Sequence, residues 1–447
     1  MKRFINSFIL FLVLLLFPSA CSINPIAGRQ YTQNISKAEV FFNVSFAAGS
    51  EMQGEMFLEV LDELSGLGLN PTRFPMQSSD GLAYSLRMSY PMGFVLKYRY
   101  VKAGSPPLIE YDSQNLQVRY RQAYINGPLA INDHVAGWLT TPFSGNTGIV
   151  QGFIFNSETS EPLSNVLVTC NGMRTFSGSD GSYSIANIPV GENMLTAVHV
   201  DGLFQPFQQK AIIASNAVTP ANFGMRPNGL VNITFIVTPP GENLVGAPIR
   251  LFGSFLSLGN SFADKRGGIT TDIAYGKNLM VRDDGSYAVT LSLPAGHPLE
   301  YRYSLGDGFW NAERDKNNSL YTRRIIIPAE DTTIHDIITT WRNSEDLPLT
   351  FHISVPSNTP AGAIVMIQFN PYVWMEPLPV WNLGNNQWLY VAYGPVEFIR
   401  SSNFRIQMID SGTVNDDLAT AGSAALGNKI ESLITDINYT VGQWSIK

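Results

Sequence analysis

Short runs in which apolar and polar residues alternate recur along the chain. Three of them, at 40–44, 233–237 and 349–353, place an apolar side chain at every second position, which predicts strands with one buried face. Turn signals such as Asp-Gly and Pro-x-Gly separate such runs. Gly and Pro are plentiful, with 38 and 27 residues, and aromatic residues reach 11%, which favours short strands over long helices. We therefore expect an all-β chain of tandem immunoglobulin-like β-sandwich domains.

One sequence interval occurs three times in the chain. Each copy has an aromatic residue followed by Arg, and a Trp at the same distance downstream; the pairs are Tyr98 and Trp138, Tyr301 and Trp341, and Phe404 and Trp444. In the first two copies, an Asp precedes the Trp by five residues. These matching spacings indicate three copies of one module of about 100 residues, with the terminal Trp of each in a core.

Two further positions keep their spacing in the first two copies. Glu110 and Glu313 follow the first Tyr of their copies at one shared distance. Arg121 and Arg324 follow it at another, so we interpret each Glu and Arg as a structural ion pair. The third copy lacks the Asp, the Glu and the Arg. The predicted organisation is a signal peptide at 1–20, a spacer at 21–36, a first repeat at 37–141, an inserted module at 148–226, a second repeat at 230–342 and a third repeat at 346–447.

The inserted module does not follow the pattern of the repeats. Its motifs are, in order, a strand at 149–155, Pro162-Leu163, a strand at 166–169, Asp180-Gly181 before Tyr183, and Ile188-Pro189 before Gly191. This order resembles the carboxypeptidase regulatory-like, or transthyretin-like, domain, which implies a β-sandwich without catalysis. Cys170 ends an apolar run, and we expect it to be a small buried core residue.

The second repeat carries the most complete set of motifs. They are Leu251-Phe252-Gly253-Ser254, Leu258-Gly259-Asn260, Asp284-Gly285-Ser286-Tyr287, Leu293-Pro294-Ala295-Gly296, Trp310 and the terminal Trp341. Their order over 230–342 is similar to the family 20 starch-binding module, a carbohydrate-binding module. That resemblance implies an α-glucan partner stacked on exposed aromatic rings, with Trp310 as one contact and Phe262 in place of a second Trp. The first repeat has Pro107 at the position of Trp310, so we expect a spacer that has lost the site and holds the other modules away from the membrane.

The third repeat concentrates aromatic residues in a short stretch. They are Tyr372, Trp374, Trp381, Trp388, Tyr390 and Tyr393. A single small sandwich has difficulty burying so many rings, so we expect some of them to be exposed and to form a binding surface. The alternative is a packed core together with an inter-domain contact. The candidate carbohydrate contacts here are Tyr372, Trp374, Trp381, Trp388 and Tyr390.

The N-terminus has the three parts of a secretory signal. Residues 1–3 are Met-Lys-Arg, residues 4–17 are largely apolar, and Pro18-Ser19-Ala20-Cys21 follows. The apolar stretch is short for a transmembrane helix. The small residues before Cys21 resemble a bacterial lipoprotein signal, although Pro18 stands where that family has Leu, and this implies an acylated Cys21 that attaches an exported protein to the membrane at the cell envelope or surface. The alternative is ordinary cleavage near Ala20 and a freely secreted protein.

Charge and chemistry-bearing residues narrow the function. The formal net charge is −7 and no basic patch stands out, so nucleic acid is not an expected partner. None of the five His residues lies at metal-ligand spacing, and neither a Gly-x-Ser-x-Gly elbow nor a phosphate-binding Gly-rich loop occurs. We therefore expect no metal, no cofactor and no enzyme activity. The leading hypothesis is a surface protein that binds starch or a related α-glucan. The alternative is a structural or adhesive surface lipoprotein whose modules keep the fold but not sugar binding.

Overall fold

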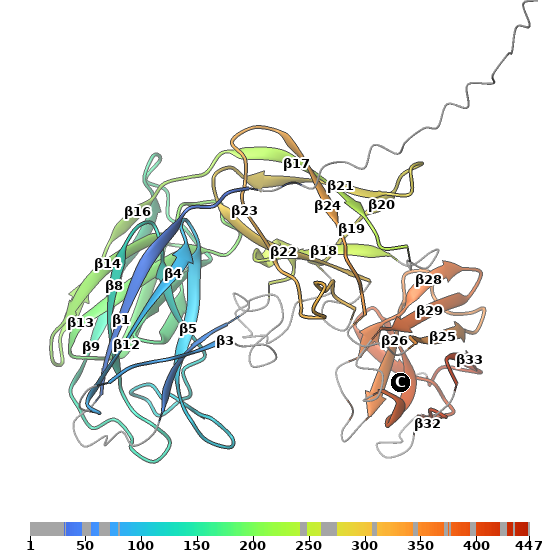
Figure 1. The fold of residues 1–447 in the computed structure, drawn as a ribbon, viewed down its shortest axis with the longest axis horizontal. Coiled ribbons are helices and arrows are strands. Elements are labelled where there is room, and N and C mark those ends of the chain that lie inside the picture. Colours follow the sequence, from blue (N-terminus) through green and yellow to red (C-terminus); the bar gives the residue numbers. More distant parts are fainter. Residues whose placement is uncertain are drawn as a thin grey trace, which may run out of the picture.

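Strands make up nearly all of the regular structure, which confirms the all-β prediction (Figure 1). The computed structural model describes residues 31, 33–46, 55–61, 72–78, 81–241, 248–260, 275–305, 311–342, 347–370, 374, 377–393, 399–420, 427–431 and 434–445. The strands of these residues form eight sheets, and two sheets fall in each of the three repeats and in the inserted module.

In the first repeat, one sheet has the strand order β4-β1-β8, and the other has the order β3-β2-β5-β6, with β7 also paired to β5. The strands are β1 (Lys37–Phe46), β2 (Met56–Val60), β3 (Thr72–Pro75), β4 (Ala83–Pro91), β5 (Val95–Lys102), β6 (Leu108–Ile109), β7 (Arg121–Tyr124) and β8 (Leu129–Val135).

The second repeat has sheets of order β20-β21-β17-β24 and β19-β18-β22-β23. Its elements are β17 (Leu230–Thr238), β18 (Ile249–Gly253), the 3-10 helix η1 (Leu256–Leu258), β19 (Lys277–Asn278), β20 (Met280–Val281), β21 (Tyr287–Pro294), β22 (Pro298–Leu305), β23 (Arg323–Ile326) and β24 (Thr332–Ile337).

The third repeat has sheets of order β28-β29-β25-β33 and β27-β26-β30-β31, with β32 also paired to β30. Its strands are β25 (Leu349–Ser354), β26 (Ile364–Asn370), β27 (Leu378–Pro379), β28 (Trp381–Gly384), β29 (Gln387–Ala392), β30 (Asn403–Asp410), β31 (Thr413–Asp416), β32 (Asn428–Lys429) and β33 (Asp436–Thr440).

The inserted module has a different topology, with sheets of order β11-β10-β13-β14 and β12-β9-β15, and β16 also paired to β9. Its strands are β9 (Thr147–Asn156), β10 (Val166–Cys170), β11 (Met173–Phe176), β12 (Ser182–Pro189), β13 (Gly191–His199), β14 (Phe207–Ile213), β15 (Val218–Pro220) and β16 (Phe223–Met225). Cys170 is buried, as predicted, and burial raises the pKa of its thiol to about 12.

The three repeats share one register as well as one topology. In each, the first strand pairs antiparallel with the fourth or fifth strand of the repeat and parallel with its last strand. A Phe on the first strand stands opposite an Ile on the last; the pairs are Phe42 and Ile131, Phe235 and Ile334, and Phe351 and Ile437. The terminal Trp follows that Ile by seven residues in every repeat and is buried, which confirms its core role.

A buried ion network lies at the end of the sandwich in the first two repeats. Arg121 pairs with Glu110 at 2.8 Å and with Asp133 at 3.3 Å. In the second repeat, the equivalent residue is Arg323, which pairs with Glu313 at 2.6 Å and Asp336 at 3.4 Å. The prediction that Arg324 fills this role is wrong; Arg324 is half-exposed and pairs with Glu300.

Tyrosine hydroxyls complete this network. In the second repeat, Tyr301 and Tyr303 both donate hydrogen bonds to Asp336, at 2.9 and 2.8 Å. Burial, together with the neighbouring Asp336 carboxylate, raises the pKa of both hydroxyls well above the usual value. Burial also raises the pKa of Glu313. The carboxylates at these positions are therefore engaged inside the fold.

The third repeat has a polar contact at the same position, but a tyrosine and an aspartate form it in place of the arginine and its carboxylates. Asp417 is the structural equivalent of Glu313. The N–H of Asp417 donates to the carbonyl of Ile406, and the N–H of Glu313 donates in the same way to the carbonyl of Tyr303. Tyr439 lies five residues before Trp444, where the other repeats have Asp, and its hydroxyl donates to Asp417. The network is therefore rebuilt without an arginine.

Candidate functional site

Four of the predicted site residues lie outside the described residues. They are Phe262, Trp310, Tyr372 and the lipidation candidate Cys21. Their roles therefore stay predictions. In the described part of the chain, no helix has the length and the apolar character needed to cross a membrane, and no group of three or more His, Cys, Asp or Glu side chains is placed to hold a metal ion.

Three of the predicted aromatic contacts are buried, which matches the alternative of a packed core together with an inter-domain contact. Trp381 is 3%, Trp388 8% and Tyr390 0% exposed. Trp388 and Tyr390 alternate with Leu389 on β29, so they point into the core of the third repeat. Trp381 faces the other way, where it packs into the hydrophobic cluster of the second repeat. These rings are engaged by protein side chains and are not available for stacking on a sugar.

The outer side of β29 is therefore an inter-domain contact. Leu389, Val391 and Tyr393 join Trp381 in the hydrophobic cluster of the second repeat. Asn311 of the second repeat fixes the contact: its Nδ2 donates to the carbonyl of Val391 at 2.6 Å, and its Oδ1 accepts from the N–H of Tyr393 at 3.1 Å. One side chain thus pairs with the backbone of β29 much as a neighbouring strand would.

Trp374 is the predicted contact that stays partly exposed. The guanidinium of Arg405 lies 4.3 Å from the centroid of its ring, which is a cation–π geometry. Gly427 packs against Cη2 and Cζ2 of the Trp374 indole. A Cβ at this residue would lie 2.5 Å from Cη2, so a side chain there would displace the ring. The indole is therefore held in a defined position.

Arg405 stands on the outer face of the sheet β27-β26-β30-β31, since its neighbours Phe404 and Ile406 point into the core. Its Nε donates to Oε1 of Gln368 at 2.7 Å. In the first repeat, the equivalent pair is Arg99 and Glu59, which form an ion pair. The third repeat thus has a neutral amide where the first has a carboxylate, and no carboxylate among the described residues pairs with Arg405.

A second pair of polar side chains lies on the same sheet. Nε2 of Gln407 donates to Oδ1 of Asp416 at 2.7 Å, and Gln407 is two residues from Arg405 on β30. Gln368, Gln407 and Asp416 are buried, whereas Trp374 and Arg405 are partly exposed, so the ring of Trp374 and the guanidinium of Arg405 are the groups that a ligand can reach. This combination allows stacking on an apolar face and hydrogen bonds to hydroxyl groups. We call Trp374, Gln368, Arg405, Gln407 and Asp416 the outer-sheet cluster.

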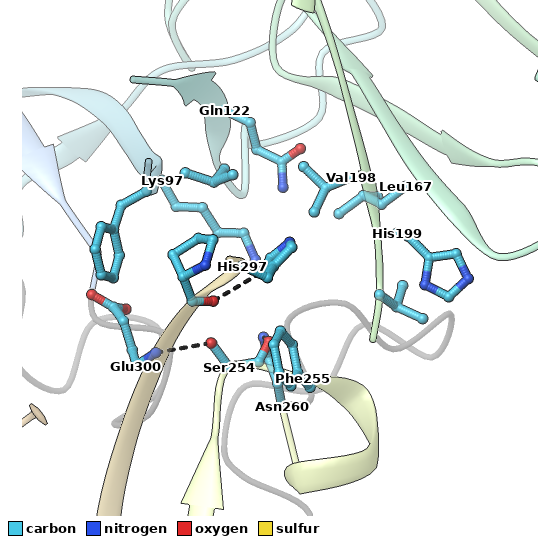
Figure 2. Close-up of a pocket in the computed structure, with 14 residues that line it drawn as sticks. Lys97, Gln122, Leu167, Val198, His199, Ser254, Phe255, Asn260, His297 and Glu300 are labelled. Carbon is cyan, nitrogen blue, oxygen red and sulfur yellow. Dashed lines mark hydrogen bonds between the residues drawn. The ribbon is translucent and has the colours of Figure 1, made fainter. Parts of the chain in front are cut away.

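A cavity lies where the first repeat, the inserted module and the second repeat meet (Figure 2). The space that water can occupy in it is about 50 Å³, enough for a few water molecules. Its polar lining includes Lys97 and Gln122 of the first repeat, His199 of the inserted module, and Ser254, Asn260, His297 and Glu300 of the second repeat.

His297 points into this cavity and is buried (Figure 2). Its Nδ1 lies 2.8 Å from the carbonyl of Pro298, which only accepts, so Nδ1 carries the proton of the neutral ring. Nε2 has no hydrogen-bond partner among the described residues. Burial lowers the pKa of His297 to about 4. No sequence pattern indicates this site, because the cavity forms only when three separate modules dock.

The loop that closes the junction needs a glycine. Gly202 of the inserted module has a φ of +65°, and a Cβ there would lie 2.6 Å from the ring of Phe255 and 3.0 Å from that of His297. Next to it, the N–H of Leu256 donates to the carbonyl of Val200 at 3.0 Å, and the N–H of Ser257 donates to Asp201 at 2.8 Å. The inserted module and the second repeat are thus in specific contact.

Comparisons with known proteins give one partial sequence match. No family model matches the chain. A stretch of 170 residues is 30% identical to an alpha-amylase of Niallia circulans, and this covers 35% of the chain and 11% of the amylase. The chain therefore spans about a tenth of the length of the curated relative that it matches.

Similar solved structures include a streptococcal ancillary pilin (11% identical, 66% of this chain and 98% of the pilin, TM-score 0.24). A shaft pilin of Lactobacillus rhamnosus GG is 9% identical over 44% of this chain and 99% of the pilin, with a TM-score of 0.19. A family 15 glucoamylase of Hypocrea jecorina is 17% identical over 26% of this chain and 20% of the enzyme, also with a TM-score of 0.19. These scores are too low to support an argument about function. The fold itself establishes a protein of immunoglobulin-like β-sandwich domains.

Proposed function

We propose that this chain is a non-catalytic carbohydrate-binding protein for starch or a related α-glucan. The partial match to an alpha-amylase carries this proposal, because it links a stretch of the chain to a protein that acts on such a polymer. The described part of the chain is β-sandwich throughout, and the match covers 11% of the amylase, so we propose a binding role for the shared stretch.

The outer-sheet cluster supports the proposal in the third repeat. A pyranose ring has an apolar face and a polar rim, so it stacks on an aromatic ring while amides and charged groups bond its hydroxyls. Trp374 offers the ring, the guanidinium of Arg405 lies over it, and the buried Gln368 accepts a hydrogen bond from Arg405. In the second repeat, Trp310 and Phe262 remain the contacts that the resemblance implies.

The buried carboxylates of the two ion networks have partners inside the fold. A glycosidase needs two carboxyl groups that face a substrate. Glu110 and Asp133 in the first repeat, and Glu313 and Asp336 in the second, are instead bonded to Arg and Tyr side chains inside the sandwich. For attachment to the cell, we propose that an acyl chain on Cys21 holds the exported protein at the membrane.

A structural or adhesive role is the second candidate, and the burial of the aromatic side chains in the third repeat favours it. Trp381 is engaged between two domains, and Trp388 and Tyr390 fill a core. Aromatic residues in these positions stabilise the domains and the contact between them, and this role does not depend on sugar binding.

Retention on insoluble starch separates the two candidates. The wild type, Trp374→Ala, Trp310→Ala and the double variant are compared, with Thr413→Ala, an exposed change in the same sheet as the outer-sheet cluster, as the matched control. Binding predicts retention of the wild type and the control, weaker retention of each Trp variant and loss in the double variant. No retention of the wild type on a panel of α-glucans contradicts glucan binding and leaves the structural role.

A further inference from the structure

The residues that precede the first repeat are bound to the second repeat. The N–H of Tyr31 donates to the carbonyl of His335 on β24 at 2.6 Å. Nε2 of Gln33 donates to the carbonyl of Ile326 on β23 at 3.1 Å, and the N–H of Ile326 donates to Oε1 of Gln33 at 2.6 Å. These residues precede the first strand of the first repeat, which begins at Lys37. They nevertheless contact the second repeat, whose first strand begins at Leu230.

These contacts are made to strand edges that would otherwise be open. In the described residues, β23 and β24 are the outermost strands of their two sheets, and such edges present unpaired backbone groups. Gln33 satisfies both backbone groups of Ile326, and the ring of Tyr31 packs against the hydrophobic cluster of the second repeat. Ile35 and Ile326 pack in turn against the core of the first repeat. The segment is therefore a docked part of the fold.

The docked segment fixes where an anchored chain leaves the protein. Tyr31 is ten positions after Cys21, and a fully extended chain covers at most about 35 Å over that distance. We propose that the second repeat, at the edge where Tyr31 binds β24, is the part of the protein that faces the lipid surface; this rests on the proposed acylation of Cys21. The first repeat is then not a spacer between the membrane and the other domains.

The outer face of the second repeat lies beside the docked segment. His335, which binds Tyr31, stands in one cross-strand row with Ile236 on β17, Ala288 on β21 and Met280 on β20. Met280 is 73% exposed, and Ile337, two residues beyond His335 on β24, is also exposed. Met280 and Ile337 stand on opposite edge strands of this sheet, β20 and β24, so among the described residues the face presents single exposed apolar side chains and no continuous apolar patch.

The first repeat extends away from this edge. β1 begins at Lys37, directly after the docked segment, and its ten residues cover about 33 Å. Ala83 pairs with Ser45 near the far end of that strand, and it is exposed. A probe at Ala83 is thus expected to lie farther from the membrane than a probe on β24.

Energy transfer to labelled lipid tests this geometry. Single fluorophores are placed on Thr333→Cys in β24, Ala83→Cys in the first repeat and Thr413→Cys in the third, and Cys170 stays unlabelled because it is buried. The acylated protein is reconstituted in phosphatidylcholine vesicles that contain an acceptor lipid. We expect the highest transfer from the Thr333 position. Equal or higher transfer from the Ala83 position would overturn the proposal.

A second set of samples separates this inference from the proposed acylation. The chain from Ser22 onward, with an N-terminal oligohistidine tag, is bound to vesicles that carry a nickel-chelating lipid. The same order of transfer is expected, even if mass spectrometry finds Cys21 unmodified. Tyr31→Ala combined with Gln33→Ala should release the segment and reduce the difference between positions. Asn34→Ala, at an exposed neighbouring residue, is the matched control and should leave the difference in energy transfer between the labelled positions unchanged.

Discussion

Lowering the pH should loosen the second repeat through His297. The ring is buried at a junction of three domains, and burial lowers its pKa to about 4, against 6.5 for an unperturbed imidazole. The groups around it are Lys97 from the first repeat, His199 from the inserted module and Glu300 from its own domain. Burial and the neighbouring His199 both disfavour the imidazolium form.

The direction and the size of the effect follow from these pKa values. Between pH 6.5 and 4, an unfolded chain binds a proton at this residue that the folded protein does not bind. The free energy of unfolding therefore falls as the pH falls through this window, by about 2.5 kcal/mol at pH 4.5 and at most about 3.4 kcal/mol below pH 4. Above pH 6.5, the contribution of His297 is constant.

Hydrogen exchange of the amides in β22 measures this loss, because it reports local opening of the second repeat. The wild type is compared with His297→Phe between pH 7.5 and pH 4.5, since a Phe preserves an aromatic contact with Phe255, whose ring centroid lies 5.3 Å away. The wild type should lose about 2.5 kcal/mol more than the variant. Equal losses in the two proteins would show that His297 does not cause the loss of stability at low pH.

Three further changes test other parts of the structure. Arg323→Met should destabilise the second repeat by about 3–5 kcal/mol, since it leaves two buried carboxylates without their cation. Arg324→Met, at a half-exposed pair, should cost less than about 1 kcal/mol. Thermal unfolding of both variants checks this order, and similar losses of stability would contradict it. Asn311→Ala should weaken docking of the third repeat by about 1–3 kcal/mol, and a red shift of tryptophan fluorescence as Trp381 becomes solvated would report it; an unchanged spectrum would count against the contact. Gly202→Ala should destabilise the junction by at least about 1 kcal/mol, because the new methyl group meets two rings and the φ is positive; unaltered resistance to limited proteolysis would contradict this.

The pattern of the sequence predicted the strands well, because they depend on local alternation of apolar and polar residues. The core role of the terminal Trp residues and the burial of Cys170 are confirmed. The assignment of Arg324 failed for a local reason. The paired Glu and Arg are one position closer together in the second repeat than in the first, so a constant offset selects the wrong one of two adjacent arginines.

The errors in the candidate site have a different origin. Whether Trp381 is exposed depends on the second repeat, which covers it, and no periodicity within the third repeat contains that information. The same holds for the docking of Tyr31 and Gln33 on β24 and β23. The outer-sheet cluster became recognisable only in the structure, where Gln368 accepts a hydrogen bond from Arg405 and the guanidinium of Arg405 lies over the ring of Trp374.

Calorimetric titration of the full-length protein with a soluble α-glucan oligosaccharide tests directly whether the outer-sheet cluster binds carbohydrate. We expect heat of binding for the wild type, a reduced affinity for Trp374→Ala and for Arg405→Ala, and no change for the control Thr413→Ala. An absence of binding to every α-glucan tried, or an affinity that neither variant alters, would contradict the assignment of the outer-sheet cluster as a carbohydrate-binding site.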